Sequence, residues 1–249
     1  MTDAELATHL AQQAGDILLA KRAELIAQGI DGKALGLAGD AAANAFLVKM
    51  LRRLRPDDGL LSEEEKDNLD RLSKSRVWIV DPVDGTREYG EARSDWAVHV
   101  GLAVDAVATV GAVALPGMDG GVVLRTDKPR PLPAAPEHPR LVVSRTRPAA
   151  EAVAVAKLLG GELVPMGSAG AKAMAVVMGE AEIYLHSGGQ FEWDSCAPVA
   201  VALAHGLHCS RIDGSPMVYN QPDTYLPDLL ICRPEWAESV LAHLRQISA

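Results

Sequence analysis

The chain of 249 residues has no excess of basic residues, few cysteines and no long apolar run. Its formal net charge of -9 argues against binding to nucleic-acid polymers, whose backbones require basic patches. Its three cysteines (Cys196, Cys209 and Cys232) are odd in number and form no Cys-x-x-Cys pair, which fits a reduced, cytoplasmic setting. Apolar stretches such as 171–179 are short and interrupted, and residues 1–20 carry acidic residues with helical spacing, so we expect neither a membrane span nor a signal peptide.

The one proline-dense segment, 128–136, is the natural boundary between two halves, 1–130 and 140–249. In the first half, two helices precede strand-like runs that are separated by turn residues. This pattern indicates an antiparallel meander and an α+β domain. The expected helices are 1–20 and 41–54, and the expected strands are 76–80, 96–104, 107–115 and 121–125.

In the second half, short strands alternate with helices, which is typical of an α/β domain. The expected strands are 141–143, 181–185 and 229–232, and the expected helices are 149–159, 169–178, 195–204 and one that Pro234 opens. Asp194 lies at the start of one of these helices. If it faces the first half, the site lies at the domain interface, where small-molecule clefts are common.

A buried, β-branched strand delivers two carboxylates, Asp81 and Asp84, into a turn. Pro82 keeps Asp81 extended, Gly85 permits close approach of the backbone, and Thr86 adds a hydroxyl beside free N–H groups. These groups are suited to binding an anion. An ordinary aspartate-capped turn explains Asp84 and Gly85, but it does not explain a second carboxylate three positions earlier.

Further carboxylates, Glu63 in an acidic run and Asp194, lie far from this turn in the sequence. Each carboxylate alone is weak evidence for a metal site, because an acidic run is usually a solvated face and an aspartate at the start of a helix is commonly a cap. If they meet Asp81 and Asp84 in one cleft, two carboxylates about 4 Å apart repel by roughly 4 kcal/mol at an effective dielectric near 20. Such a cluster needs cations, and oxygen ligands select Mg²⁺, Mn²⁺ or Ca²⁺ over zinc.

Three motifs resemble the signatures of the inositol monophosphatase-like, magnesium-dependent, lithium-sensitive phosphatases: Ser-Glu-Glu at 62–64, Asp-Pro-Val-Asp-Gly-Thr at 81–86 and Glu-Trp-Asp-Ser-Cys-Ala at 192–197. Within that superfamily the chain is most similar to the CysQ-type 3′-phosphoadenosine-5′-phosphate (PAP) phosphatases of actinobacteria, through segments 84–89, 167–172 and 188–194. The resemblance implies a layered αβαβα sandwich. It also implies a small phosphorylated nucleotide as substrate and a homodimer, as in many relatives.

The resemblance further implies a set of metal ligands. Glu63, Asp81 and the carbonyl of Val83 would hold one Mg²⁺, while Asp81, Asp84 and Asp194 would hold a second. A third, weaker ion is expected near Glu63, which also counts among the catalytic residues. Mn²⁺ is expected to substitute for Mg²⁺, and Li⁺ and Ca²⁺ are expected to inhibit.

Asp40 falls where the family keeps a carboxylate that pairs with the motif threonine, here Thr86, to orient the attacking water. The N–H groups of Gly85 and Thr86 would receive the phosphate. The chain departs from the pattern twice: Ser62 stands where a glycine is usual, and Gly-Leu-Ala-Gly at 36–39 replaces the more polar residues that commonly precede Asp40.

Candidate substrate-binding residues lie mainly in the second half. Ser168 opens a helix whose N–H groups suit an anionic or hydroxyl group, and Lys172 lies one turn further in; a capped helix with a solvated lysine is the alternative. Arg145 is expected to pair with the 5′-phosphate, although exposed arginines before a helix are ordinary. His186 and Tyr184 lie near the expected cleft, where either would contact the base or simply pack.

The sequence therefore predicts a Mg²⁺-dependent phosphomonoesterase that converts PAP to AMP and phosphate, and also acts on the sulfated nucleotide PAPS. Water would attack directly without a phosphoenzyme, and the reaction would remove a by-product of sulfate activation. One alternative is an inositol-1-monophosphatase or fructose-1,6-bisphosphatase with the same metal site. Another is a non-catalytic metal- or nucleotide-binding regulator.

Overall fold

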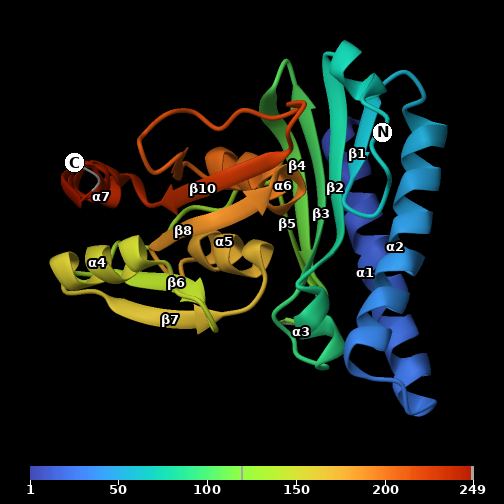
Figure 1. Cartoon of the computed structure of the whole chain (residues 1–249), viewed down its shortest axis with the longest axis horizontal. Helices are drawn as coiled ribbons and strands as arrows, with labels where there is room; N and C mark the ends of the chain where they lie inside the picture. The colour runs from blue at the N-terminus through green and yellow to red at the C-terminus, as the bar shows by residue number, and fades with distance from the viewer. Residues whose placement is uncertain (119, 248–249) are drawn as a thin grey trace.

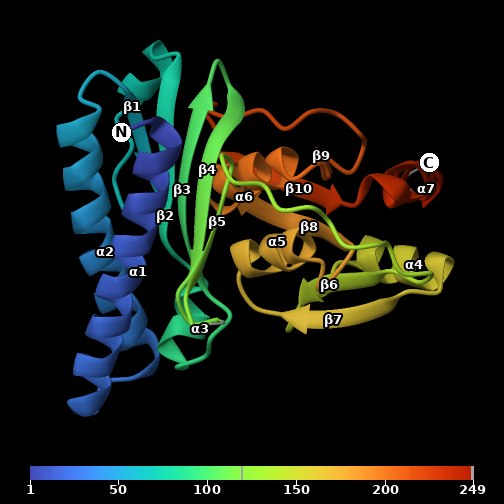
Figure 2. The same cartoon turned by 180° about the vertical axis from the view of Figure 1, so that it is seen from behind.

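The computed structural model describes residues 1–118 and 120–247, and it has alternating layers of helices and sheets (Figure 1). One helix pair covers the outer face of the first sheet, a second pair lies between the two sheets, and a third covers the outer face of the second sheet (Figures 1 and 2). This arrangement confirms the αβαβα sandwich. From the outside of the first sheet, the helices are α1 (Asp3–Ala27) and α2 (Gly32–Leu54), then α5 (Ala169–Met178) and α6 (Glu192–Ala204), then α4 (Ala150–Leu159) and α7 (Pro234–Ile247).

The first sheet has the strand order β1-β2-β3-β4-β5. The antiparallel meander that the sequence predicts is present in β2 to β5, but the short strand β1 pairs parallel to β2 and was not expected. This pairing sets Ser62 opposite Val80, so the chain after β1 emerges beside the motif turn. The strands are β1 (Gly59–Ser62), β2 (Arg76–Asp84), β3 (Ala97–Val104), β4 (Val107–Leu115) and β5 (Val122–Arg125), with the 3-10 helix η1 (Asp70–Ser73) and α3 (Thr86–Gly90) on either side of β2.

Helix α2 begins nine residues earlier than the expected segment 41–54, so Asp40 lies inside the helix rather than before it. The prediction failed because two glycines there read as breakers, whereas they serve close packing. A Cβ on Gly36 would lie 2.7 Å from Thr86 Cγ2, and one on Gly39 would lie 2.6 Å from the ring of Tyr89. The glycines therefore let α2 carry Asp40 up to the motif turn.

The second sheet has the order β7-β6-β8-β10-β9, in which β6 is parallel to β7 and β8, and β10 is antiparallel to β8 and β9. Two strands, β7 and β9, were not expected, and β8 continues well past the predicted end at residue 185. It does so through a bulge where Gly188 and Gly189 both have positive φ. The strands are β6 (Arg140–Ser144), β7 (Glu162–Met166), β8 (Ile183–Phe191), β9 (His208–Ser210) and β10 (Tyr225–Cys232).

One cluster of buried side chains joins the two halves of the chain: it includes Val113 of the first sheet, Ala197 of α6 and Ile231 of the second sheet. The division into domains 1–130 and 140–249 stays a prediction. Among the described residues, α2 is long and apolar enough to pass as a membrane span by length and composition. Half of its apolar window is buried in the fold, and a core helix meets the same criteria.

Candidate active site

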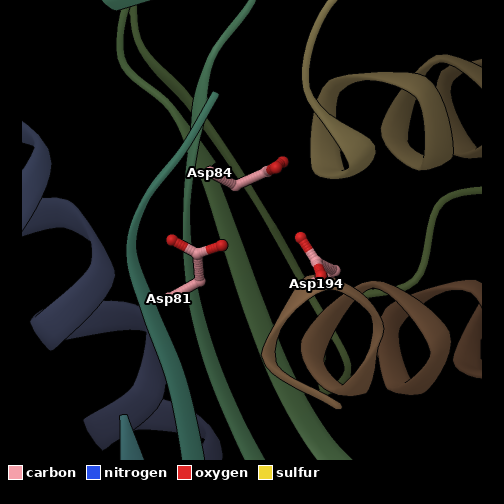
Figure 3. Close-up of side chains that lie close together, drawn as sticks. All are labelled: Asp81, Asp84 and Asp194. Atoms are coloured by element: carbon pink, nitrogen blue, oxygen red, sulfur yellow. The ribbon is translucent and has the colours of Figure 1, made fainter. Parts of the chain in front are cut away.

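Three carboxylates converge where the C-terminal end of β2 meets the start of α6 (Figure 3). Asp81, Asp84 and Asp194 each offer an oxygen that lies within 4.8 Å of the others. In a regular strand, residues three positions apart face opposite sides. A bulge between Asp81 and Asp84, where two residues of β2 oppose one of β3, turns both carboxylates toward the same space.

Asp194 reaches this space from the other half of the chain. It is the third residue of α6, and its Oδ2 accepts a hydrogen bond of 2.7 Å from the N–H of Phe191. Helix α6 packs across the inner face of β3 and β4, which brings its first turn against the end of β2. The convergence of Asp194 with the two motif aspartates, which the sequence predicted, is therefore present.

Glu63 follows β1 directly and lines the same cleft as Asp84 and Asp194. Burial raises the pKa of Glu63 to about 7, reinforced by repulsion from Asp194 and Asp84 and opposed by its hydrogen bond with Asp81. Burial and the charge of Glu63 hold the pKa of Asp81 well above its usual value, and burial with repulsion from Asp84 raises that of Asp194 to about 6. Such crowded oxygen donors fit a divalent cation of the Mg²⁺ type.

Asp84 differs from its neighbours because it has positive partners. Burial would raise the pKa of Asp84, but the imidazole of His99, whose Nε2 lies 3.3 Å from the carboxylate, and the hydrogen bonds from Ser168 and Gly170 hold it below its usual value. The N–H of Ala169 also donates to Asp84, at 3.1 Å. The carboxylate therefore stays ionised at the N-terminus of α5.

His99 is a site residue that the sequence analysis did not identify. Its side chain is fully buried, and its Nδ1 lies 3.0 Å from the carbonyl oxygen of Trp193. Burial lowers the pKa of His99, but the charge of Asp84 outweighs burial and the net shift is upward. Its register in the sheet places it at the site, since His99 pairs directly with Asp81 across β2 and β3.

Asp40 lies in α2 beside Thr86, as the sequence predicted. It is buried, and its Oδ1 has no hydrogen-bond partner among the described residues. Burial raises its pKa to about 7 against the opposing effect of the Thr86 hydroxyl. That hydroxyl donates to the carbonyl oxygen of Val83 at 3.1 Å. Gly85 has φ of 87°, a conformation that favours glycine, and it allows the chain to turn from β2 into α3.

A cleft of about 370 Å³ opens beside the carboxylate cluster. It brings together the predicted residues Gly85, Ser168, Lys172 and His186. Lys172 is not solvated: burial lowers its pKa, and its Nζ donates to the carbonyl oxygens of Gly167, at 3.2 Å, and Ser168. The cleft is lined by Glu63, Asp84, Gly85, Ser144, Ser168, Ala169, Lys172, Tyr184, His186, Gly189, Gln190, Phe191, Trp193 and Asp194.

Arg145 is not among the residues that line this cleft. Its guanidinium forms ion pairs with Glu88 and, at 3.4 Å, with Glu91. Binding of a 5′-phosphate by Arg145 therefore requires that the phosphate displace or join these carboxylates. The assignment stays a prediction.

The fold is that of a known class. The structure superposes on CysQ from Bacteroides thetaiotaomicron, a bacterial member of the inositol monophosphatase family, with a TM-score of 0.77 at 24% identity, over 93% of this chain and 97% of the other. It superposes on an inositol monophosphatase from Anabaena (Nostoc) sp. PCC 7120 with a TM-score of 0.74 at 22% identity, over 98% and 94% of the two chains.

The model of the inositol monophosphatase family matches residues 2–249, and the chain belongs to this family. It is 48% identical over 261 residues to the 3′-phosphoadenosine 5′-phosphate phosphatase of Mycobacterium leprae, covering 99% of this chain and 95% of that protein. It is 51% identical over 238 residues to the protein of that name from Mycobacterium tuberculosis, covering 92% and 88%.

Proposed function

We propose that this protein is a Mg²⁺-dependent phosphatase that removes the 3′-phosphate of adenosine 3′,5′-bisphosphate, yielding AMP and phosphate, and that it also acts on the sulfated nucleotide PAPS. The observation that carries the proposal is the cluster of Asp81, Asp84 and Asp194 in a chain about half identical to relatives named for this activity. Its role is in sulfate assimilation, in the cytoplasm, and it acts as a homodimer.

The carboxylates divide into two ligand sets. Glu63, Asp81 and the carbonyl of Val83 would hold one Mg²⁺, and Asp81, Asp84 and Asp194 would hold the second. When bound, the ions supply charge neutralisation for the phosphate and lower the pKa of a water molecule. Burial together with mutual repulsion raises the pKa of Glu63, Asp81 and Asp194, and this supports the assignment, because a bound cation would stabilise their charged forms.

The remaining site residues orient the attacking water and bind the phosphate. Asp40, with a pKa of about 7 and an unpartnered Oδ1, is suited to accept a proton from water near neutral pH, and Thr86 holds that water in line with the ester. The N–H groups of Gly85 and Thr86 receive the phosphate oxygens. Because Asp84 is fixed by His99 and by α5, it keeps its place as substrate enters and leaves.

The substrate lies in the cleft beside the cluster, with Ser168, Lys172 and His186 on its nucleotide side. The charge on Lys172 offsets part of the repulsion between the acidic site and an anionic substrate. Arg145 contributes to binding of the 5′-phosphate by exchanging its present carboxylate partners for it.

The experiment compares turnover of PAP, PAPS, inositol 1-phosphate and fructose 1,6-bisphosphate by the purified protein, with Mg²⁺ and with a chelator. We expect a large preference for the adenosine bisphosphates, activity with Mn²⁺, and inhibition by Li⁺ and Ca²⁺. A preference for inositol 1-phosphate would assign the protein to the inositol phosphatases instead. Absence of phosphate release from every substrate would favour a binding regulator, and a trapped phosphoenzyme would exclude direct attack by water.

A further inference from the structure

Beyond the carboxylate cluster, the cleft contains an amide oxygen that has no hydrogen-bond partner among the residues that the structure describes. The side chain of Gln190 is 7% exposed, and its Oε1 has no hydrogen-bond partner. Its Nε2 bonds the hydroxyl of Tyr184 at 2.8 Å. A hydroxyl can accept or donate, so Tyr184 satisfies one end of the amide in either orientation and leaves the other end free. A buried amide end without a partner costs free energy unless a ligand pairs with it.

The next residue, Phe191, adds an exposed aromatic surface at the same place. Its side chain is 43% exposed although it is large and apolar, and it lines the cleft together with Trp193. The two rings are stacked, with centroids 4.9 Å apart and planes within 12°. Exposed aromatic surface beside a polar, ion-binding cluster is the kind of surface that binds a flat apolar group.

The ring of Phe191 also contacts a ring on the neighbouring strand. Tyr225 pairs with Phe191 across β8 and β10, and their rings meet edge to face at 6.0 Å. Gly189 makes this possible, because a Cβ there would lie 2.6 Å from the ring of Tyr225. The stacked rings of Phe191 and Trp193, here called the platform, are therefore held in place before a ligand arrives, which lowers the entropic cost of binding.

The position of this platform relative to the cluster fixes which part of a substrate it meets. The N–H of Phe191 donates to Asp194, so the aromatic pair begins one hydrogen bond away from a carboxylate of the cluster. A phosphomonoester held at the cluster would extend its leaving group along the cleft toward these rings. A group with a flat face and a hydrogen-bonding edge matches a ring pair next to a free amide, whereas a polyol has no flat face.

We propose that Gln190, Phe191 and Trp193 form the nucleobase subsite: the base stacks on the Phe191–Trp193 pair, and the exocyclic amino group of adenine donates to the Gln190 amide oxygen. This inference rests on the proposed nucleotide phosphatase function. Base–aromatic stacking and amide contacts to adenine are both common modes of recognition. The subsite makes these residues determinants of specificity, distinct from the groups that hold metal and phosphate.

The test compares PAP with 1-deoxyribose 3,5-bisphosphate, which has both phosphates and no base. Wild-type protein should prefer PAP, and Phe191→Leu should lower kcat/KM for PAP by about tenfold, mainly through KM, while the abasic substrate changes by less than about twofold. Gln190→Met should act in the same direction. Phe46→Leu, the same change at the one other phenylalanine, on α2 and outside the cleft, should leave the ratio of the two substrates unchanged.

Equal losses on both substrates would overturn the inference, since Phe191 would then act through Asp194. So would an unchanged ratio in both cleft variants. Turnover of inositol 1-phosphate without turnover of PAP by the wild type would instead overturn the proposed function, and the subsite with it. A second measurement covers variants that fold poorly: in wild-type protein with Mg²⁺, AMP should quench tryptophan fluorescence more than ribose 5-phosphate does, and Trp193→Phe should remove the difference.

Discussion

Ser168 donates its hydroxyl hydrogen to the carboxylate of Asp84, so the last residue of β2 is bound to the residue that caps α5. The same hydroxyl accepts the N–H of Ala171 at 3.0 Å, which makes it both a helix cap and a support for the cluster. One carboxylate of the cluster is therefore positioned by both halves of the chain.

Asp84→Asn is expected to reduce kcat by about 100-fold or more, because it removes charge from a metal ligand without changing its size. The melting temperature should fall only moderately, since an asparagine oxygen at the Oδ2 position still accepts from Ser168 and Gly170, and only the N–H of Ala169 loses its acceptor. Steady-state kinetics and thermal melting check both expectations. Asp127→Asn, which makes the same change in an exposed ion pair with Arg125, should leave kcat unchanged. Near-normal turnover of Asp84→Asn would contradict its placement.

The stability of the metal-free protein should depend on pH through Glu63, Asp40 and Asp194. Their pKa values are raised to about 7, 7 and 6, above the ordinary carboxyl values, so the folded state binds more protons than the unfolded state between about pH 4 and pH 7. Stability is then lost as pH rises through this window and is lowest above it. Asp84, with a lowered pKa, acts in the opposite sense only at lower pH.

Thermal melting with a chelator and with saturating Mg²⁺ tests this expectation. Cations relieve the repulsion and bind the folded state, so the increase in Tm caused by Mg²⁺ should be larger at pH 8 than at pH 5. Glu63→Gln should reduce the pH dependence of the chelated protein. An identical Tm with and without metal at pH 8 would show that the carboxylates do not form a cation site.

Gly36→Ala should lower activity while leaving the protein folded. Alanine ordinarily stabilises a helix by up to about 1 kcal/mol relative to glycine. Here the new Cβ would lie 2.7 Å from Thr86 Cγ2 and 3.0 Å from its carbonyl oxygen, so α2 must shift away from the motif turn. We expect the shift to separate Asp40 from Thr86 and to lower kcat more than it raises KM. Full activity with increased stability would show that the contact between these segments is dispensable.

Arg71→Met should destabilise the fold by about 3 kcal/mol, because it breaks a buried ion pair and leaves polar partners unsatisfied. Arg71 is buried, pairs with Asp67 at 2.7 Å, and bonds the side chain of Asn220 at 2.8 Å and the carbonyl of Gln221 at 3.0 Å. Denaturant unfolding measures the loss.

Arg52→Met is the matched control for Arg71→Met. It removes an exposed partner of Glu65 at 3.3 Å and should cost less than about 1 kcal/mol. An equal decrease in the free energy of unfolding in the two variants would show that the burial of Arg71 does not contribute to stability.

The sequence predicted those parts of the site that depend on local patterns. Asp81, Asp84 and Gly85 follow an obvious strand, and Asp194 opens an obvious helix. The extent of α2 was not predictable, because glycine lowers helix propensity and only the tertiary contact of Gly36 with Thr86 explains its presence. Strand β1 and the long end of β8 were missed for a similar reason: four residues give little periodicity, and two glycines in β8 resemble a turn.

His99 and Gln190 show a second limit of predicting site residues from the sequence. Each is a single polar residue in a strand, and a buried polar residue that packs has the same local sequence as one that serves a site. His99 could be recognised only from its register beside Asp81, and Gln190 only from its unpaired oxygen. Pairing across strands and burial are properties of the assembled chain, so they remained outside the reach of sequence patterns.

The hydrogen bonds from Ser168, Ala169 and Gly170 to Asp84 have a consequence for proteolysis in the proline-rich segment 128–136. A cut there would leave every ligand side chain chemically intact, yet it would separate Asp84 from its donors and from Asp194 as soon as the two fragments parted. The N-terminal fragment would keep Glu63, Asp81 and Val83, but the second ligand set would lack Asp194, so neither fragment would hold both ions. Mixing the fragments should restore catalysis only to the extent that they find each other again.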